Sequence, residues 1–356
     1  MTTIADVAAQ AGVSIATVSR ILNDTAVAAP DTKYRVLQAV QDLNYQPNQS
    51  ARNLRRQRTG VILILTPNMT NPFYASILQG IGDTAAGLGY AAFICNTSDD
   101  QKRSFTALDR LTRRQADGAI ILSIDQDGHW LAPYAADFPV VQCAEYQPSA
   151  EAAHVSIDNY TASRDIMDYL LGLGHRRIAH ISAANAYGST SARLKGYDDA
   201  LAAAGISPRP EYVTRGSADY SFASGKRMAQ QLLTLDEKPT AIYCISDTLA
   251  LGAVVGAQEM GLRVPDDVTI TGFDNISETE MIRPYLTTLA QPCYELGCTA
   301  TQVLDDLIGR RTTPLEKVLD HKLVVRESSG PAPMGAPERL DGYRRPPSSN
   351  KEGDIS

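Results

Sequence analysis

The sequence has 356 residues, of which 44% are hydrophobic and 21% charged, and its formal net charge is −7. This length leaves room for a small domain and one or two larger domains with hydrophobic cores. No stretch of about 18 apolar residues is free of charge, which predicts no membrane span, and the N-terminus has no signal-peptide pattern. Five cysteines without a CxxC pair predict reduced thiols, so the composition predicts a cytoplasmic protein.

Residues 3–22, TIADVAAQAGVSIATVSRIL, predict two short helices joined by a tight turn. Thr3 and Asp6 form a capping-box pattern at the start of the first helix, and Ser14 can cap the second. Gly12 lies where the turn needs a backbone angle that other residues avoid. This is the pattern of a helix-turn-helix, whose second helix can enter the major groove of DNA. The alternative is a pair of core helices in an ordinary α-helical domain.

Basic residues are concentrated in this N-terminal part. Residues 1–59 contain seven basic and four acidic side chains, a balance of +3, which leaves −10 for the remainder. The densest cluster is ARNLRRQR at 51–58, which could also be a solvated linker. A third helix is predicted from Pro30 to Leu43, since proline suits the first helical position. A basic head on an acidic body is expected if only the head meets phosphates.

After Thr59 short apolar runs alternate with amphipathic segments. The predicted strands are 61–65, 91–95, 118–122, 139–143, 177–181, 241–245 and 268–273. The predicted helices lie near 73–88, 103–114, 161–173, 191–204, 222–234, 247–260 and 293–309. This alternation predicts an α/β fold with two parallel sheets, each covered by helices on both faces. Proline, glycine, serine and charge dominate the C-terminal end, so residues 329–356 are predicted to be a disordered tail.

The sequence contains no pattern that supports catalysis. There is no GxSxG or P-loop motif, and the five histidines are dispersed. His175 and His180 are five residues apart, which does not place both on one helical face as a zinc pair requires. The GLGH run at 172–175 fits a helix end and not a dinucleotide-binding fingerprint. No enzyme activity, cofactor or metal site is therefore predicted.

Several motifs together resemble the LacI family of bacterial repressors, in order from about residue 2 to residue 328. They are GVSIATVSR, PNQSARNLRR, NPFYASILQGI, DNYTASRDIMDYLLGLGHRRIAHIS, PTAIYCISDTLALGAV, GLRVPDDVTITGFDN and PYLTTLAQPCYELG. The resemblance implies an all-α headpiece followed by two doubly wound parallel-sheet subdomains, like those of a periplasmic binding protein.

The resemblance also implies the domain boundaries. The headpiece would take residues 1–46, and a hinge helix and linker residues 47–59. The effector-binding core would take residues 60–328, and its chain would cross three times between two subdomains. The N-subdomain would comprise 60–159 and 291–320, and the C-subdomain 160–290 and 321–328. The ligand would lie between them at the carboxyl ends of the strands, where open α/β sheets bind ligands.

The resemblance places the residues that read DNA bases at the start of the second helix. Arg20 can pair with guanine, whereas Ile15 and Ala16 offer only contact with thymine methyls or a fit of shape. Polar side chains nearby suit phosphate contacts, with capping or surface polarity as their alternative. The set implied to bind DNA is Thr3, Ser14, Ile15, Ala16, Thr17, Ser19, Arg20, Asn23, Asn48, Ser50, Ala51, Leu54 and Arg55.

Leu54 matches a hinge leucine that dimers of the family insert into the minor groove at the operator centre. An apolar wedge of this kind unstacks a base step and bends the duplex. The alternative is that Leu54 packs the hinge helix. Two half-sites read by a two-fold homodimer imply a near-palindromic operator.

Effector-binding residues follow from matching motifs in the core. Arg193 matches an arginine that binds ligand hydroxyls or a carboxylate, and Asp274 matches an aspartate that accepts from sugar hydroxyls. Together they can hold a ribose diol as donor and acceptor. Phe73 matches a ring that stacks on ligand, although core packing is its alternative. Ser246 replaces a common asparagine, which disfavours a lactose-like site. The full set implied to bind effector is Phe73, Tyr74, Glu145, Arg193, Tyr220, Phe222, Ser246 and Asp274.

Two aromatic walls and a diol clamp suit a nucleoside. The sequence therefore predicts a transcriptional repressor that a nucleoside releases from DNA, at work in the cytoplasm on the nucleoid. A sugar effector, and a corepressor that tightens DNA binding as in a purine-type repressor, are the alternatives. A periplasmic solute-binding protein would share the core but would need a signal peptide and no headpiece.

Overall fold

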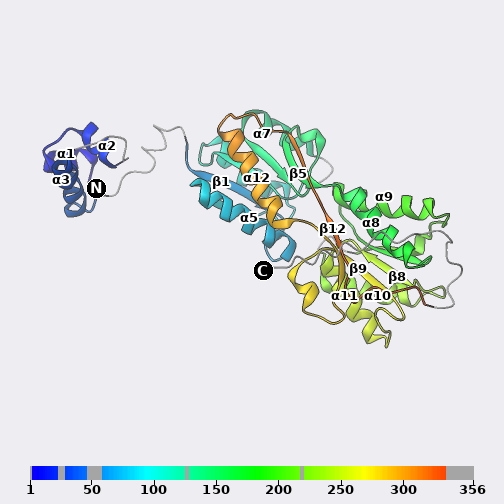
Figure 1. Ribbon diagram of the computed structural model, residues 1–356. Coiled ribbons are helices and arrows are strands. Elements are labelled where there is room, and N and C mark those ends of the chain that lie inside the picture. The colour runs from blue at the N-terminus through cyan, green and yellow to red at the C-terminus, as the bar shows by residue number, and fades with distance from the viewer. Residues whose placement is uncertain (1, 23–28, 46–57, 125–127, 217–219, 334–356) are drawn as a thin grey trace, which may run out of the picture. The chain divides into compact units, whose positions relative to one another are not determined.

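The computed structural model of the chain describes residues 2–22, 29–45, 58–124, 128–216 and 220–333. These form two compact units, one within residues 1–60 and one from residue 61 onward. Figure 1 shows the helical unit in blue and the larger α/β unit in the remaining colours. None of the helices in the described ranges is long and apolar enough to cross a membrane.

The small unit contains the predicted helix-turn-helix. Thr3 and Asp6 form the expected capping box, because the Thr3 hydroxyl accepts from the Asp6 backbone and the Asp6 carboxylate accepts from the Thr3 N–H at 2.8 Å. Gly12 ends the first helix with φ +64°, a left-handed conformation that suits glycine. Apolar residues of the three helices within the described part of this unit form one small core. The helices are α1 (Ile4–Ala11), α2 (Ile15–Leu22) and α3 (Pro30–Asp42).

The first sheet of the large unit has the strand order β11-β5-β4-β3-β1-β2, with every pair parallel. Its strands are β1 (Val61–Thr66), β2 (Ala91–Asn96), β3 (Gly118–Ile121), β4 (Val140–Cys143), β5 (Ala153–Ile157) and β11 (Glu316–Leu319). The main helices of this subdomain are α5 (Pro72–Leu88), α6 (Gln101–Thr112), α7 (Ala132–Asp137) and α12 (Cys293–Ile308). In Figure 1, α5 and α12 run side by side in this subdomain, as their many contacts require.

The second sheet has the strand order β12-β10-β9-β8-β6-β7, in which only the β10–β12 pair is antiparallel. Its strands are β6 (Ile178–Ala183), β7 (Val213–Gly216), β8 (Ala241–Cys244), β9 (Thr269–Asp274), β10 (Thr287–Ala290) and β12 (Lys322–Val324). Its helices are α8 (Asn159–Gly172), α9 (Gly188–Ala203), α10 (Phe222–Leu233) and α11 (Asp247–Glu259). Short 3-10 turns are η1 (Gly128–Leu131), η2 (Pro148–Ala150), η3 (Pro210–Tyr212) and η4 (Ser277–Glu280).

The central strands of both sheets are buried on both faces, which explains the unbroken apolar runs in the sequence. In β1, Ile62 and Ile64 belong to the core on one face and Leu63 and Leu65 to the core on the other. A parallel strand covered by helices on each side needs apolar residues at consecutive positions. The α/β class and the two doubly wound sheets are therefore as predicted. The chain passes between the sheets three times, after β5, after β10 and between β11 and β12.

The predicted disorder of residues 329–356 is wrong at the start of that segment. The Ser329 hydroxyl lies 2.7 Å from the Tyr169 hydroxyl, and the Gly330 carbonyl accepts from His175 Nε2 at 3.0 Å. The Ala332 N–H donates to the Leu173 carbonyl at 3.0 Å. These bonds fasten the segment to the C-subdomain as far as residue 332. Residues 334–356 lie outside the described part of the chain.

Candidate DNA-binding surface and effector pocket

The second helix of the helix-turn-helix, α2, has one buried and one exposed face. Val18 and Ile21 are buried in the headpiece core, whereas Ile15, Ala16 and Arg20 lie on the exposed face. Ile15 is 49% exposed, which is unusual for a large aliphatic side chain at the start of a helix. An exposed apolar residue beside an arginine suits contact with base edges in the major groove.

The polar residues of this region have local structural roles. The Ser14 hydroxyl accepts from the Thr17 N–H at 3.1 Å and lies 2.9 Å from the Thr17 hydroxyl, so it caps α2 as expected. Thr3 is engaged in the capping box of α1, and Ser19 lies half-buried on α2. The other residues implied to contact DNA lie outside the described residues: Asn23, Asn48, Ser50, Ala51, Leu54 and Arg55.

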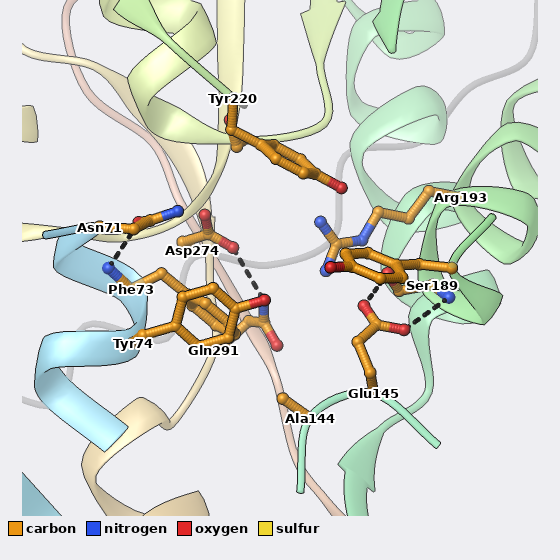
Figure 2. Close-up of a pocket in the computed structure, with 12 residues that line it drawn as sticks. Asn71, Phe73, Tyr74, Ala144, Glu145, Ser189, Arg193, Tyr220, Asp274 and Gln291 are labelled. Atoms are coloured by element: carbon orange, nitrogen blue, oxygen red, sulfur yellow. Dashed lines mark hydrogen bonds between the residues drawn. The ribbon is translucent and has the colours of Figure 1, made fainter. Parts of the chain in front are cut away.

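A pocket lies between the two subdomains at the carboxyl ends of their strands. Figure 2 shows side chains from both subdomains converging on it. Seven of the eight residues implied to bind effector line this pocket: Phe73, Tyr74, Glu145, Arg193, Tyr220, Ser246 and Asp274. Its lining also includes Asn71, Ala144, Tyr187, Ser189 and Gln291, which the sequence analysis did not single out.

Phe222 does not line the pocket. It is the first residue of α10 and is 39% exposed. Tyr220, which was also implied to bind effector, does line the pocket. Figure 2 shows Tyr220 entering from the C-subdomain, whereas Phe73 and Tyr74 enter from the start of α5. The rings of Phe73 and Tyr74 meet edge to face, with 5.0 Å between their centroids.

Arg193 is a buried cation held in a fixed orientation. Its Nε donates to Asn159 Oδ1 at 2.9 Å and its Nη1 to the Ile245 carbonyl at 2.7 Å. The guanidinium carbon also lies 3.6 Å from the centroid of the Phe273 ring. These contacts immobilise the side chain before any ligand arrives, which reduces the entropy that binding would cost. The pocket thus offers a rigid, charged hydrogen-bond donor.

Asp274 supplies a buried acceptor at the end of β9. Its Oδ1 accepts from Gln291 Nε2 at 2.8 Å, and its backbone has φ +117°. Burial raises the pKa of Asp274 to about 7, although nearby Arg193 opposes the rise. Burial also raises the pKa of the neighbouring Asp247 well above its usual range, and the charge of Asp274 adds to that effect. A ligand hydroxyl would give the Asp274 carboxylate a hydrogen bond that favours its ionised form.

Glu145 forms hydrogen bonds between the two subdomains, in the same pocket as Arg193 and Asp274. It follows β4, and its carboxylate accepts from the Ser189 N–H at 3.2 Å and from the Ser189 hydroxyl at the start of α9. Figure 2 shows both bonds at the edge of the pocket. Burial raises the pKa of Glu145, and the hydrogen bonds from Ser189 oppose the rise. Ser246 has a local role, because its hydroxyl accepts from the Leu249 N–H and caps α11.

Comparison with known proteins identifies the class to which this fold and site belong. The family model described as periplasmic binding proteins and sugar binding domain of LacI family matches residues 59–323, and that of bacterial regulatory proteins, lacI family, matches residues 3–48. The HTH-type transcriptional repressor CytR of Escherichia coli K12 is 38% identical over 339 residues, which are 93% of this chain and 97% of that protein.

Solved structures agree with this assignment. The lac repressor dimer bound to operator and the anti-inducer ONPF is 27% identical, with a TM-score of 0.83 over 92% of this chain and 99% of that one. A LacI family regulator from Enterococcus faecium with bound ribose is 30% identical, with a TM-score of 0.68 over 76% and 99%. The headpiece and the two-sheet core are those of a DNA-binding transcriptional regulator. The chain belongs to the LacI family and is a transcriptional repressor.

Proposed function

We propose that this repressor binds a near-palindromic operator as a homodimer and that a nucleoside such as cytidine releases it. The observation that carries the choice of effector is the presence of Arg193, Asp274 and four aromatic rings in one pocket. A rigid cationic donor and a carboxylate acceptor suit the two hydroxyls of a ribose. The rings of Phe73, Tyr74 and Tyr220 provide apolar surface for the base.

A sugar effector is the second candidate, because a relative at 30% identity is described with bound ribose. Ribose would satisfy Arg193 and Asp274 equally well but would leave the aromatic surface without a partner. Affinity for the nucleoside should therefore exceed affinity for free ribose. A corepressor mode uses the same pocket and differs only in which DNA-binding state the ligand favours.

Dimerisation is supported by the exposed edge of the first sheet. Strand β2 lies at this edge, and its Phe93 and Ile94 side chains are 48% and 43% exposed. An apolar patch on an edge strand is a typical place for a second copy to pack. The relative bound to operator is itself described as a dimer.

The release mechanism follows from the position of the pocket between the subdomains. Effector binding changes their relative orientation, and residues 47–59 transmit the change to the headpiece of residues 1–46. In this scheme Leu54 leaves the minor groove, and the operator dissociates. Linkage requires an effector that favours the released state to bind the DNA-bound form more weakly by the same factor. The repressor then acts in the cytoplasm, on operators in the nucleoid.

Replacement of Leu54 by alanine tests the hinge. The expected result is weaker operator binding with unchanged effector affinity, because the wedge contacts only DNA. Fluorescence anisotropy with an operator duplex selected from a random pool measures the first quantity, and calorimetry measures the second. Operator affinity equal to that of the unmodified protein would rule out the wedge.

Calorimetry against cytidine, adenosine, ribose and a plain hexose tests the choice of effector. Saturable heat with a nucleoside and little response to the sugars is the expected result. Binding of a sugar without binding of either nucleoside would be consistent with a repressor but would contradict a nucleoside effector. Any ligand that binds is then added to the protein–operator complex, where release supports induction and tighter binding indicates a corepressor.

A further inference from the structure

The first turn of α9 contacts the opposite subdomain at two places. Tyr187, at the N-cap position of this helix, makes no side-chain cap, and Glu145 of the N-subdomain binds the Ser189 N–H instead. A carboxylate at this end of a helix also interacts favourably with the helix dipole. The second contact belongs to Tyr187 itself, whose hydroxyl reaches Asp99 of the N-subdomain.

The Tyr187–Asp99 hydrogen bond is short, and a second donor binds the same carboxylate oxygen. The Tyr187 hydroxyl donates to Asp99 Oδ1 at 2.6 Å, and the Ser123 hydroxyl donates to the same oxygen at 3.1 Å. Asp99 follows β2 with φ +55°, so the chain turns sharply to present its carboxylate. Tyr187 is 7% exposed, and burial raises the pKa of its phenol, which therefore stays protonated as a donor.

The Tyr187 ring lies between two cavities. It lines the effector pocket, and it also lines an outer cavity whose wall includes Asp99, Ser123 and Trp130. The side chain that borders both spaces is thus tied across the subdomains by its own hydroxyl. Movement of this ring, or separation of the subdomains at this edge, requires that the bond to Asp99 break.

We propose that the Tyr187–Asp99 hydrogen bond is a latch that holds the subdomains together beside the effector pocket. Effector enters and leaves when the latch opens, and the latch lengthens the residence time of bound effector. Tyr187 and Asp99 are then positioning residues that set the rate of exchange, whereas Arg193 and Asp274 supply the contacts. The inference rests on the proposed function for its effect on ligand exchange, but the latch itself is testable without ligand.

The first test uses the fluorescence of Trp130, which is the only tryptophan in the chain and lines the outer cavity. Tyr187→Phe removes the hydroxyl and keeps the ring. Asp99→Gly removes the carboxylate at a positive φ that glycine accepts without strain. Each variant should raise acrylamide quenching of Trp130 about twofold, because a local opening becomes more populated. The double variant should show no further increase, since both changes break the same bond.

Tyr169→Phe is the matched control. It removes a tyrosine hydroxyl whose 2.7 Å bond to Ser329 stays within the C-subdomain, and quenching should not change. Asp99→Asn retains an uncharged acceptor, so it should raise the quenching of Trp130 less than Asp99→Gly does. Quenching equal to that of the unmodified protein in both Tyr187→Phe and Asp99→Gly would overturn the latch, as would additive effects in the double variant.

The second test measures dissociation of whichever of cytidine, adenosine or ribose binds, by stopped-flow displacement. Loss of one hydrogen bond to a charged acceptor predicts about tenfold faster dissociation in Tyr187→Phe. An unchanged rate would contradict the latch. If none of the three ligands binds, the proposed effector class fails, while the Trp130 experiment still decides the latch.

Discussion

Asp274→Asn should stabilise the effector core at high pH and impair effector binding. The buried carboxyl has a pKa of about 7 in the folded protein, against an ordinary value of 3.8. This difference corresponds to about 4 kcal/mol by which the ionised side chain disfavours the folded state. Asparagine keeps an oxygen that can accept from Gln291, tolerates a positive φ as aspartate does, and carries no charge.

The pH dependence has a defined sign. Because the pKa of Asp274 is raised on folding, its contribution to stability is complete below pH 3.8 and is lost as the pH rises through about 7. Between pH 5 and pH 8 the unmodified protein should therefore lose about 3 kcal/mol that the variant keeps. The advantage of the variant should be large at pH 8 and small at pH 5.

Urea unfolding at the two pH values, followed by Trp130 fluorescence, measures this difference. Asp266→Asn is the control, because Asp266 is an exposed carboxyl paired with Arg263. In Asp274→Asn, loss of a charge-assisted hydrogen bond to a ligand hydroxyl should weaken effector binding by about 10- to 100-fold. Equal stabilisation at pH 5 and pH 8 would refute the electrostatic reasoning, and unchanged affinity would remove Asp274 from the ligand contacts.

Two further predictions use neighbouring residues as controls. Phe73→Ala should weaken nucleoside binding about 5- to 150-fold by calorimetry, since a stacked base is worth about 1–3 kcal/mol, whereas Phe222→Ala should leave it unchanged; equal losses would argue against stacking on Phe73. Gly80→Ala should destabilise the core by about 1–3 kcal/mol in urea unfolding, because the new Cβ would lie 2.1 Å from the Tyr294 carbonyl oxygen. Gly82→Ala, on the same helix with open space around it, should stabilise by about 0.5–1 kcal/mol. Equal effects of the two alanines would show that α5 and α12 do not approach as closely as described.

The sequence predicted the elements that have a strong local signal. The capping box at Thr3 and Asp6, the left-handed Gly12 and the apolar run of β1 each depend on a few adjacent residues. Strands β5, β7, β10 and β11 were not anticipated among the strands, because they are short and mix polar with apolar residues. In β11, for example, Glu316 is exposed, and the strand is defined by its pairing with β5.

Only some residues of the pocket were predicted, because the others are defined by contacts with residues distant in the sequence. Arg193 and Asp274 stand in motifs that resemble those of the family, so their roles could be carried over. Tyr187 and Ser189 act through partners about 88 and 44 residues away, Asp99 and Glu145, and no local pattern marks such a contact. The placement of Ser329 against Tyr169 likewise depends on tertiary contacts and not on composition.

In the proposed function, a nucleoside bound beside Arg193 lowers the affinity of the protein for operator DNA. The most direct measurement is anisotropy of a labelled operator duplex, bound by the full chain, during titration with cytidine and separately with a plain hexose. A saturable fall in anisotropy with cytidine alone, lost in Arg193→Met with operator affinity retained, is the predicted result. Release by the hexose, or no change with cytidine or adenosine, would contradict the claim.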